Sequence, residues 1–401
     1  MRIALFHNTP SGGAKRAIYE WVRRLVARHQ IDIYTLSTAE HAFCDIRPFA
    51  QQHRVFDFRP RKLFESPWGR LNQLQRWRDL GELTQIAQRI AGEINAGDYD
   101  IVFAHTCRFT FIPAVLQFVQ IPSIYYLHEP FGRTFSRQIQ RPYLKDNGWR
   151  ERLDRFDPLI RLYHHRLETT QRQSVRHTKR LLANSHFTQE QMKMGFGVDT
   201  PVCYLGVDSE SFRPIPGIAK EDFVLSVGEL SPRKGFDFIV EGLRVMSPDK
   251  RPKLKLVCNS VNPLEKDYVE RLAAQGGVDL HVLANLKTDE LAIQYNKAQL
   301  CVYAPVMEPF GLAPLEAMSC GTPVVGVREG GVQESIAHER TGLLVERDPA
   351  QFAAAVQHLL SSPTLIVEYG YNSREHVLRR WTWDQAVAQL EEHLNDVLRT
   401  A

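Results

Sequence analysis

The sequence contains no apolar run as long as the roughly 18 residues that a membrane-spanning helix needs. Its start, MRIALFHN, lacks the long apolar stretch and the small-residue cleavage site of a signal peptide, and we interpret it as a β-strand. The six cysteines are scattered, without the paired spacing of a metal site or a redox motif. We therefore expect a cytoplasmic protein whose cysteines are small core residues.

Acidic residues are scarce in the first half of the chain. Residues 1–200 carry 30 Lys and Arg against 19 Asp and Glu, whereas residues 201–401 carry 20 against 27. A basic half indicates contact with something anionic. The stretches 59–89 and 133–180, rich in arginine and tryptophan, are either solvated helix faces or an acceptor surface for an anionic glycan or lipid head group. Peripheral contact with an anionic membrane, at the inner face of the cell membrane, is included in the second reading.

No recognisable nucleic-acid-binding module accompanies this charge, so we expect no nucleic acid as a partner. The chain also lacks internal repeats and low-complexity segments. At 401 residues it is too long for one ordinary core and has about the length of two domains.

Strand patterns alternate with amphipathic helix patterns, and a linker containing glycine and proline interrupts them at residues 204–222. Helices are expected over 61–95 and 150–178. Alternating strands and helices predict parallel sheets covered by helices on both faces. The expected fold class is α/β, with two doubly wound domains facing one another. Strands are expected at 2–6, 31–36, 99–105, 122–128 and 179–185, and after the linker at 223–228, 253–259, 278–284, 300–305 and 323–327.

Two glutamates, Glu308 and Glu316, lie in the stretch MEPFGLAPLEAMSCGTPVVG, residues 307–326. Glu308 follows a strand, and Glu316 lies about one turn inside a short helix expected over 313–320. Amides at the start of that helix favour an anion. The plainer alternatives are a capping role for Glu316 and a solvated loop position for Glu308.

The stretch 307–326 resembles the signature of retaining glycosyltransferases of family 4, in which two glutamates flank seven residues in an E-x-F-G-x-x-x-x-E-A-M-x-x-G-x-P-V-V frame. The resemblance implies the two-domain GT-B architecture. Residues 1–205 would form the acceptor-side domain, with the helix 383–401 packing back on it, and residues 206–382 would bind a nucleotide-sugar. Other segments similar to family motifs are PSGGAKR (10–16), YYLHEP (125–130), YLGVDSESFRP (204–214), VGELSPRKG (227–235), GGVQE (330–334) and TGLLV (341–345).

For the donor sugar, the resemblance implies that Glu308 holds sugar hydroxyls and that Glu316 accepts hydrogen bonds from the ribose. The amides of Phe310, Gly311 and Leu312 would contact the sugar and the phosphate. These roles agree with the chemistry of the groups, because carboxylates bind vicinal hydroxyls and a helix N-terminus binds phosphate.

The loop at 227–235 carries Arg233 and Lys234, which the resemblance assigns to the donor phosphates. A departing nucleoside diphosphate gains negative charge, and fixed cations aimed at it lower the barrier. A solvated basic pair is the alternative. Glu229 stands where the family often has an arginine, so Arg233 could replace that cation.

Gly12 and Gly13 follow the first strand and open a helix, so a phosphate or sugar could approach the backbone closely. A plain turn is equally compatible with a bare glycine pair. Lys15 and Arg16 in the same turn either touch phosphate or are exposed.

His128 ends the strand 122–128, and the family's matching histidine lies near the anomeric region of the donor and the acceptor. A buried core histidine is the alternative, and His105 on the neighbouring strand could do similar work. Asp98 and Asp100 resemble a metal-binding Asp-x-Asp, but they precede a strand and so lie at its amino end. We expect no metal site and no cofactor.

The function that the resemblance implies is transfer of a hexose from a UDP- or GDP-sugar to a hydroxyl of a glycan or lipid-linked acceptor. The reaction would be metal-independent and retaining, with front-face displacement. Alternatives are a sugar-nucleotide epimerase or phosphorylase on the same fold, or a sugar-nucleotide-binding protein without catalysis.

Overall fold

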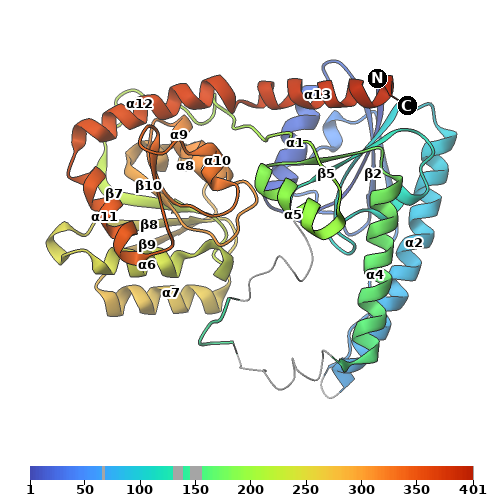
Figure 1. The fold of residues 1–401 in the computed structure, drawn as a ribbon, viewed down its shortest axis with the longest axis horizontal. Helices are drawn as coiled ribbons and strands as arrows, with labels where there is room; N and C mark the ends of the chain where they lie inside the picture. The colour runs from blue at the N-terminus through green and yellow to red at the C-terminus, as the bar shows by residue number, and fades with distance from the viewer. Residues whose placement is uncertain (66–67, 130–138, 145–155, 401) are drawn as a thin grey trace.

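The computed structural model describes residues 1–65, 68–129, 139–144 and 156–400. These residues contain two six-stranded sheets in two lobes that lie side by side (Figure 1). The recorded pairings between neighbouring strands are parallel, as the alternation of strands and helices predicts. The expected α/β class with two doubly wound sheets is confirmed.

The first sheet has the strand order β3-β2-β1-β4-β5-β6. Helices α1 and α13 cover one of its faces, and α2 and α4 cover the other. Its strands are β1 (Arg2–Asn8), β2 (Gln30–Leu36), β3 (Gln52–Phe56), β4 (Ile101–Cys107), β5 (Ser123–Leu127) and β6 (Arg180–Ala183). Its helices are α1 (Gly13–Leu25), α2 (Asn72–Ala96), α4 (Pro158–His177), α5 (His186–Phe196) and, from the end of the chain, α13 (Trp383–Arg399).

The second sheet repeats this topology with the order β12-β11-β10-β7-β8-β9. Its strands are β7 (Glu221–Val227), β8 (Lys253–Cys258), β9 (Leu280–Ala284), β10 (Ala298–Tyr303), β11 (Val324–Val327) and β12 (Gly342–Val345). Helices α6 (Phe236–Val245), α7 (Pro263–Gly276), α11 (Pro349–Leu360) and α12 (Pro363–Arg380) cover one face. Helices α8 (Thr288–Lys297), α9 (Leu312–Ser319) and α10 (Val332–Ser335) cover the other.

Each sheet reverses its strand order at one point, between β1 and β4 in the first and between β7 and β10 in the second. Ligands of open α/β sheets bind outside the carboxyl ends of the strands at such a point. The glycine pair, the loop at 228–235 and the glutamate loop at 304–311 follow β1, β7 and β10 respectively. The topology therefore brings the predicted site segments to the two switch points.

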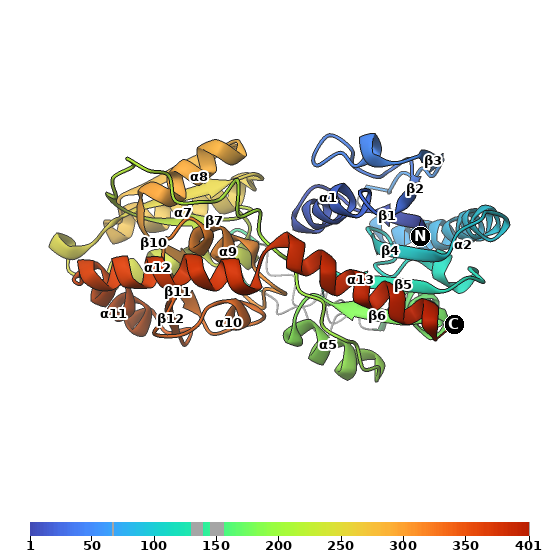
Figure 2. The same cartoon turned by 90° about the horizontal axis from the view of Figure 1, so that it is seen from above.

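The linker that leaves the first lobe and the segment that returns to it near Trp381 cross between the lobes beside each other. The amide of Val207 donates to the carbonyl of Trp381 at 2.8 Å. A Cβ added to Gly206 would lie 2.4 Å from the amide nitrogen of Trp383, so only glycine permits this approach. Figure 2 shows that α12 and α13 then continue in line across both lobes.

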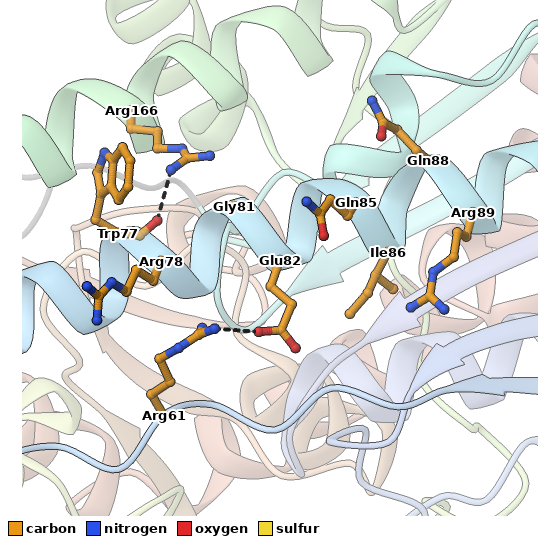
Figure 3. A pocket seen from close by; sticks show the side chains of 10 residues that line it. All are labelled: Arg61, Trp77, Arg78, Gly81, Glu82, Gln85, Ile86, Gln88, Arg89 and Arg166. Carbon is orange, nitrogen blue, oxygen red and sulfur yellow. Dashed lines mark hydrogen bonds and ion pairs between the residues drawn. The ribbon is translucent and has the colours of Figure 1, made fainter.

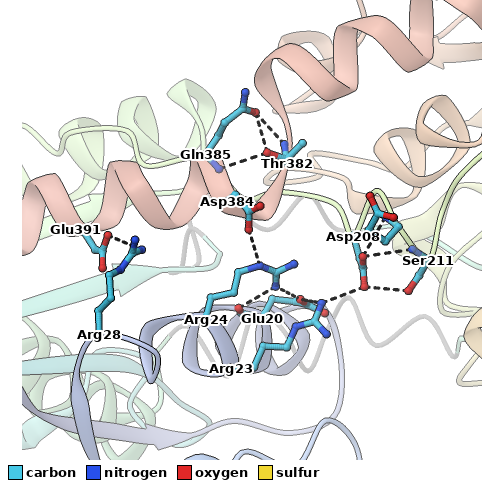
Figure 4. Close-up of polar contacts among 11 residues, drawn as sticks. Glu20, Arg23, Arg24, Arg28, Asp208, Ser211, Thr382, Asp384, Gln385 and Glu391 are labelled. Atoms are coloured by element: carbon cyan, nitrogen blue, oxygen red, sulfur yellow. Dashed lines mark hydrogen bonds and ion pairs between the residues drawn. The ribbon is translucent and has the colours of Figure 1, made fainter.

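Helix α1 contacts both crossings through its charged side chains (Figure 4). Glu20 pairs with Arg23 at 2.7 Å and with Arg24 at 2.5 Å. Arg24 also contacts Asp384 of α13 at 3.1 Å, and Arg23 contacts Asp208 of the linker at 3.0 Å. One carboxylate of the first lobe thus orients two arginines toward the two segments that leave and re-enter it.

All ten predicted strands are present, each within two residues of its expected ends. The edge strands β3 and β12 were not predicted. Side chains of β3 are mostly exposed, so the strand lacks the apolar signal of a buried one.

The helix expected from residue 61 begins at Asn72, and that prediction was wrong at its start. Asn72 accepts from the amide of Phe64 at 2.6 Å and donates to its carbonyl at 3.0 Å, which folds the preceding segment into a loop. The expected helix 150–178 is α4 from Pro158 onward, and residues 150–155 lie outside the described residues.

Candidate functional site

The loops that follow β7 and β10 are bound to each other by backbone contacts. The amide of Val306 donates to the carbonyl of Arg233 at 2.8 Å. Gly235 has φ +65°, and a Cβ there would lie 2.1 Å from the carbonyl oxygen of Ala304. Arg347 donates to the carbonyls of Ala304 and Pro305 at 3.1 and 2.7 Å. These backbone contacts and Arg347 therefore fix the loops after β7 and β10 relative to each other.

The glutamate loop is pressed against the GGVQE segment. A Cβ on Gly330 would lie 2.2 Å from the carbonyl oxygen of Glu308, and one on Gly331 would lie 2.2 Å from that of Pro309. The amide of Gly331 also donates to Glu308 at 2.9 Å. The two glycines are needed because backbone meets backbone here, and this contact sets the position of Glu308.

Lys234 reaches Glu308, with Nζ 2.8 Å from Oε2. Both side chains are largely buried, so the pair is partly withdrawn from water. Arg233 is exposed, and within the described part of the chain its guanidinium has no ion pair. Glu229 is exposed as well. Among the described residues, the turn thus presents one cation in an ion pair, Lys234, and one outside any ion pair, Arg233.

Helix α9 begins at Leu312, one residue before the expected start, after Gly311 at φ +92°. Phe310 is buried, and no acidic side chain occupies the first turn. The amides at this helix start are therefore available to an anion. Glu316 is buried one turn later, where it accepts from Arg16 at 2.6 Å and from Tyr295 at 3.0 Å.

The glycine pair of the first lobe leads into α1, which also has no acidic residue in its first turn. Gly12 has φ +143°, and a Cβ on either Gly12 or Gly13 would meet nothing within 4 Å. Lys15 is buried beside His7, with Nζ 3.4 Å from Nε2, and burial lowers its pKa to about 8. Arg16, in the same turn, is the residue that pairs with Glu316, so the starts of α1 and α9 lie near each other.

His128 is buried and contacts His105, with Nε2 of the former 3.1 Å from Nδ1 of the latter. Burial lowers the pKa of His128 to about 3, and burial and the neighbouring His128 lower the pKa of His105 well below its usual range. Both rings are therefore neutral near pH 7. Asn184 donates to the carbonyl of His128 at 2.7 Å, and the adjacent Ser185 donates to that of Pro309 at 2.5 Å.

A family model described as Glycosyltransferase Family 4 matches residues 11–211, half of the chain, and one described as Glycosyl transferases group 1 matches residues 208–376. The chain belongs to glycosyltransferase family 4. The recognised family is thus confirmed.

Related glycosyltransferases match part of the chain. D-inositol 3-phosphate glycosyltransferase 2 of Catenulispora acidiphila is 30% identical over 231 residues, which is 52% of this chain and 54% of that protein. A GDP-mannose-dependent alpha-(1-6)-phosphatidylinositol monomannoside mannosyltransferase of Mycobacterium tuberculosis is 30% identical over 235 residues, 52% of this chain and 60% of that protein. The match spans little more than half the length of these relatives.

Among solved structures, HepE of Anabaena in complex with UDP-glucose superposes with a TM-score of 0.71 at 19% identity, covering 99% of this chain and 100% of that chain. At this identity the likeness shows the fold alone. The GT-B architecture expected from the resemblance is confirmed.

Several residues of this family 4 site were not predicted. Arg347 and Tyr295 hold the glutamate loop and Glu316, and neither lies in a quoted motif. Glu334 lies in the GGVQE motif, and its carboxylate accepts from the amides of His186 and Phe187 at 2.9 and 3.0 Å. This motif therefore joins the second lobe to the start of α5 as well as supporting Glu308.

The Asp-x-Asp segment of the family 4 chain lies at the opposite edge of the first sheet. Asp100 accepts from the amide of Arg2 at 2.7 Å, at the amino end of β1. Within the described residues, no group of three or more His, Cys, Asp or Glu side chains could hold a metal ion. No described helix is long and apolar enough to cross a membrane.

A groove of about 940 Å³ lies on the first lobe along α2, and it is also lined by Arg61 and by Arg166 of α4 (Figure 3). Arg166 of α4 stacks over the ring of Trp77 at 4.3 Å and donates to its carbonyl at 3.0 Å. Arg61 pairs with Glu82 at 3.0 Å, while Arg78 is exposed. None of the predicted catalytic or donor residues lines it.

Replacing Gly330 by alanine tests the backbone contact that supports Glu308. The added Cβ would clash with a carbonyl, and φ at this residue is +63°, so we expect the free energy of unfolding to fall by about 1–3 kcal/mol. Urea denaturation measures it. Gly13→Ala is the matched control, because its Cβ meets open space, and it should leave stability unchanged or raise it by up to ~1 kcal/mol. Equal stabilities of the two variants would contradict the contact.

Proposed function

We propose that the protein is a retaining hexosyltransferase that moves a hexose from a UDP- or GDP-sugar to a hydroxyl of a glycan or lipid-linked acceptor. The observation that carries this proposal is the Lys234–Glu308 pair at 2.8 Å, at the start of α9. Such a pair would offer a cation to a phosphate and a carboxylate to sugar hydroxyls, close to the amides at the start of α9.

The diphosphate of the donor would lie among Arg233, Lys234 and the amides of Phe310, Gly311 and Leu312. Negative charge develops on the leaving diphosphate as the glycosidic bond breaks, and a fixed, partly desolvated cation stabilises it. The open glycine pair of α1 offers a second helix start, on the acceptor side. His128 is neutral, so it would act as a hydrogen-bonding group near the anomeric carbon rather than as a charge.

Both glutamates keep acceptor capacity for a sugar. A carboxylate offers about four lone-pair positions. Glu308 uses one for Lys234, and Glu316 uses one on each oxygen for Arg16 and Tyr295. Glu316 therefore retains one position on each oxygen, which suits the two adjacent hydroxyls of a ribose.

The matched proteins support a nucleotide-sugar donor without deciding its base. One relative is named as GDP-mannose-dependent, and a structural neighbour holds UDP-glucose. Thermal-shift screening against UDP- and GDP-sugars would choose between them, since a donor at a hundred times its Kd stabilises the fold by ~2.7 kcal/mol. A donor that is bound but transferred to no acceptor would favour an epimerase, a phosphorylase or a binding protein.

Charge-neutral substitutions separate the two glutamates. We expect Glu308→Gln to lower kcat on the order of a hundredfold, because its hydroxyl contact tightens in the transition state. Glu316→Gln should mainly raise donor KM, about tenfold, because the ribose is bound alike in both states. Steady-state kinetics measures both. Glu346→Gln, an exposed carboxylate of the same lobe, is the control. If Glu308→Gln matches that control, the carboxylate has no part in turnover.

Metal independence is part of the proposal. With Arg233, Lys234 and helix amides facing the diphosphate, transfer should continue at the same rate in EDTA. Rates of purified enzyme with and without chelator give the answer. Activity that is lost and then restored by Mn²⁺ would refute this point and return attention to Asp98 and Asp100.

A lipid-linked acceptor is favoured by exposed apolar side chains beside arginines at the start of α2. Phe64 and Trp68 are 43% and 65% exposed, and Arg61, Lys62 and Arg70 lie among them. Aromatic side chains next to basic ones suit an anionic membrane surface. We propose this surface as a peripheral membrane contact.

Vesicle sedimentation tests the membrane contact. Wild-type protein should sediment with vesicles of anionic lipid, and Trp68→Ala should weaken binding. Salt at 1 M, where the screening length is ~3 Å, should release it. Val367→Ala removes a side chain of 73% exposure from α12 and should change nothing. Equal binding to neutral vesicles, or no effect of Trp68→Ala, would exclude this surface.

A further inference from the structure

Residues 139–144 belong in sequence to the first lobe, between β5 and α4, but they lie against the second lobe (Figure 1). Arg141 is the centre of this contact, with a side chain that is 4% exposed. Tyr143 supports it, because its hydroxyl donates to Glu265 and its ring lies 6.1 Å from that of Tyr268. We call residues 139–144 the clamp.

Every donor nitrogen of Arg141 has an acceptor. Nε donates to the two oxygens of Glu265 at 3.1 and 2.9 Å. Nη2 donates to Glu265 at 2.9 Å, to Asp237 at 3.0 Å and to the carbonyl of Pro232 at 3.2 Å. Nη1 contacts Asp237 at 3.0 Å and the carbonyl of Gln140 at 3.3 Å. Planar, multiply bonded arginine contacts of this kind fix geometry as well as charge.

The partners of Arg141 surround the turn that carries the donor-phosphate cations. Pro232 is the first residue of the turn Pro232–Lys234. Asp237 lies in the first turn of α6, directly after it, and Glu265 lies in the first turn of α7. A residue from the acceptor-side lobe thus binds the backbone that positions Arg233 and Lys234.

We propose that Arg141 is a positioning residue for the donor-phosphate turn. Its guanidinium holds the carbonyl of Pro232 and the starts of α6 and α7 in one arrangement. Lys234 therefore points toward Glu308 only while Arg141 keeps its contacts with the second lobe. Placement of the leaving-group cations therefore depends on a residue of the other lobe. This role rests on the proposed transferase function for its kinetic consequence, but not for its structural one.

The test uses the full-length chain with a double substitution, Arg141→Met with Glu265→Met. Replacing Glu265 together with Arg141 avoids leaving the fully buried Glu265 carboxylate unpaired, which would by itself destabilise the fold, whereas the carboxylate of Asp237 is 23% exposed and keeps contact with water. The matched control is Arg251→Met. Arg251 binds the opposite ends of the same two helices, donating to the carbonyls of Leu243 and Gly276 at 3.0 and 2.7 Å.

Amide hydrogen exchange of the ligand-free protein measures how firmly the turn Pro232–Lys234 is held. We expect the amides of Lys234, Gly235 and Val306 to exchange at least about tenfold faster in the double variant, and at the wild-type rate in Arg251→Met. Unchanged exchange at these amides, or the same acceleration in the control, would overturn the proposal.

Kinetics supplies the second measurement. Because the cations act on charge that develops in the transition state, kcat of the double variant should fall about tenfold or more, with a smaller change in donor KM. Wild-type kcat in the double variant would refute the role in turnover. If the wild type transfers no sugar at all, the transferase proposal fails, and the exchange measurement still decides whether Arg141 positions the turn.

Discussion

Close backbone packing around the end of β10 is the constraint on which the site depends. Gly235 meets Ala304, and Gly330 and Gly331 meet the loop that carries Glu308, all at distances that exclude a Cβ. Interiors packed at this density do not deform gradually, so the loop has one position. The turn Pro232–Lys234, the loop that carries Glu308 and the start of α9 are positioned by these backbone contacts.

Charged pairs at this site serve placement more than stability. Taking Lys234 and Glu308, or Arg16 and Glu316, out of water costs several kcal/mol per ion, and their attraction recovers this only with good geometry. Their value lies in holding polar groups in fixed positions, which in the proposed transfer reaction would reduce the reorganisation that the chemistry requires. The Arg16–Glu316 pair also makes the Glu316 carboxylate a contact between the lobes.

Structural features that depend on neighbouring residues could be predicted from the sequence. Side-chain pairs between residues far apart in the sequence could not. The strands were predictable from buried apolar runs, and α9 from Pro314, Gly321 and Pro323, because these residues act on their own neighbours. The Arg16–Glu316 pair joins residues 300 positions apart. The Arg141–Glu265 pair spans 124 positions.

Such pairings leave no periodic signal in a sequence. In a sequence, a basic residue that binds a phosphate cannot be told apart from one that pairs with a carboxylate or from one that is simply exposed. The family resemblance supplied roles for Glu308 and Lys234, but it could not indicate that they would contact each other. That contact forms because the loops after β7 and β10 pack against each other, and this packing can be seen only in the folded structure.

The positions of the crossings and the clamp have a mechanical consequence. In Figure 1 the crossings lie along one side of the molecule, and residues 139–144 lie at the other. A small rotation of one lobe about the crossings would change distances beside the crossings little and distances at residues 139–144 more. A slight opening on that side would therefore lengthen several of the hydrogen bonds that Arg141 makes to the second lobe at the same time.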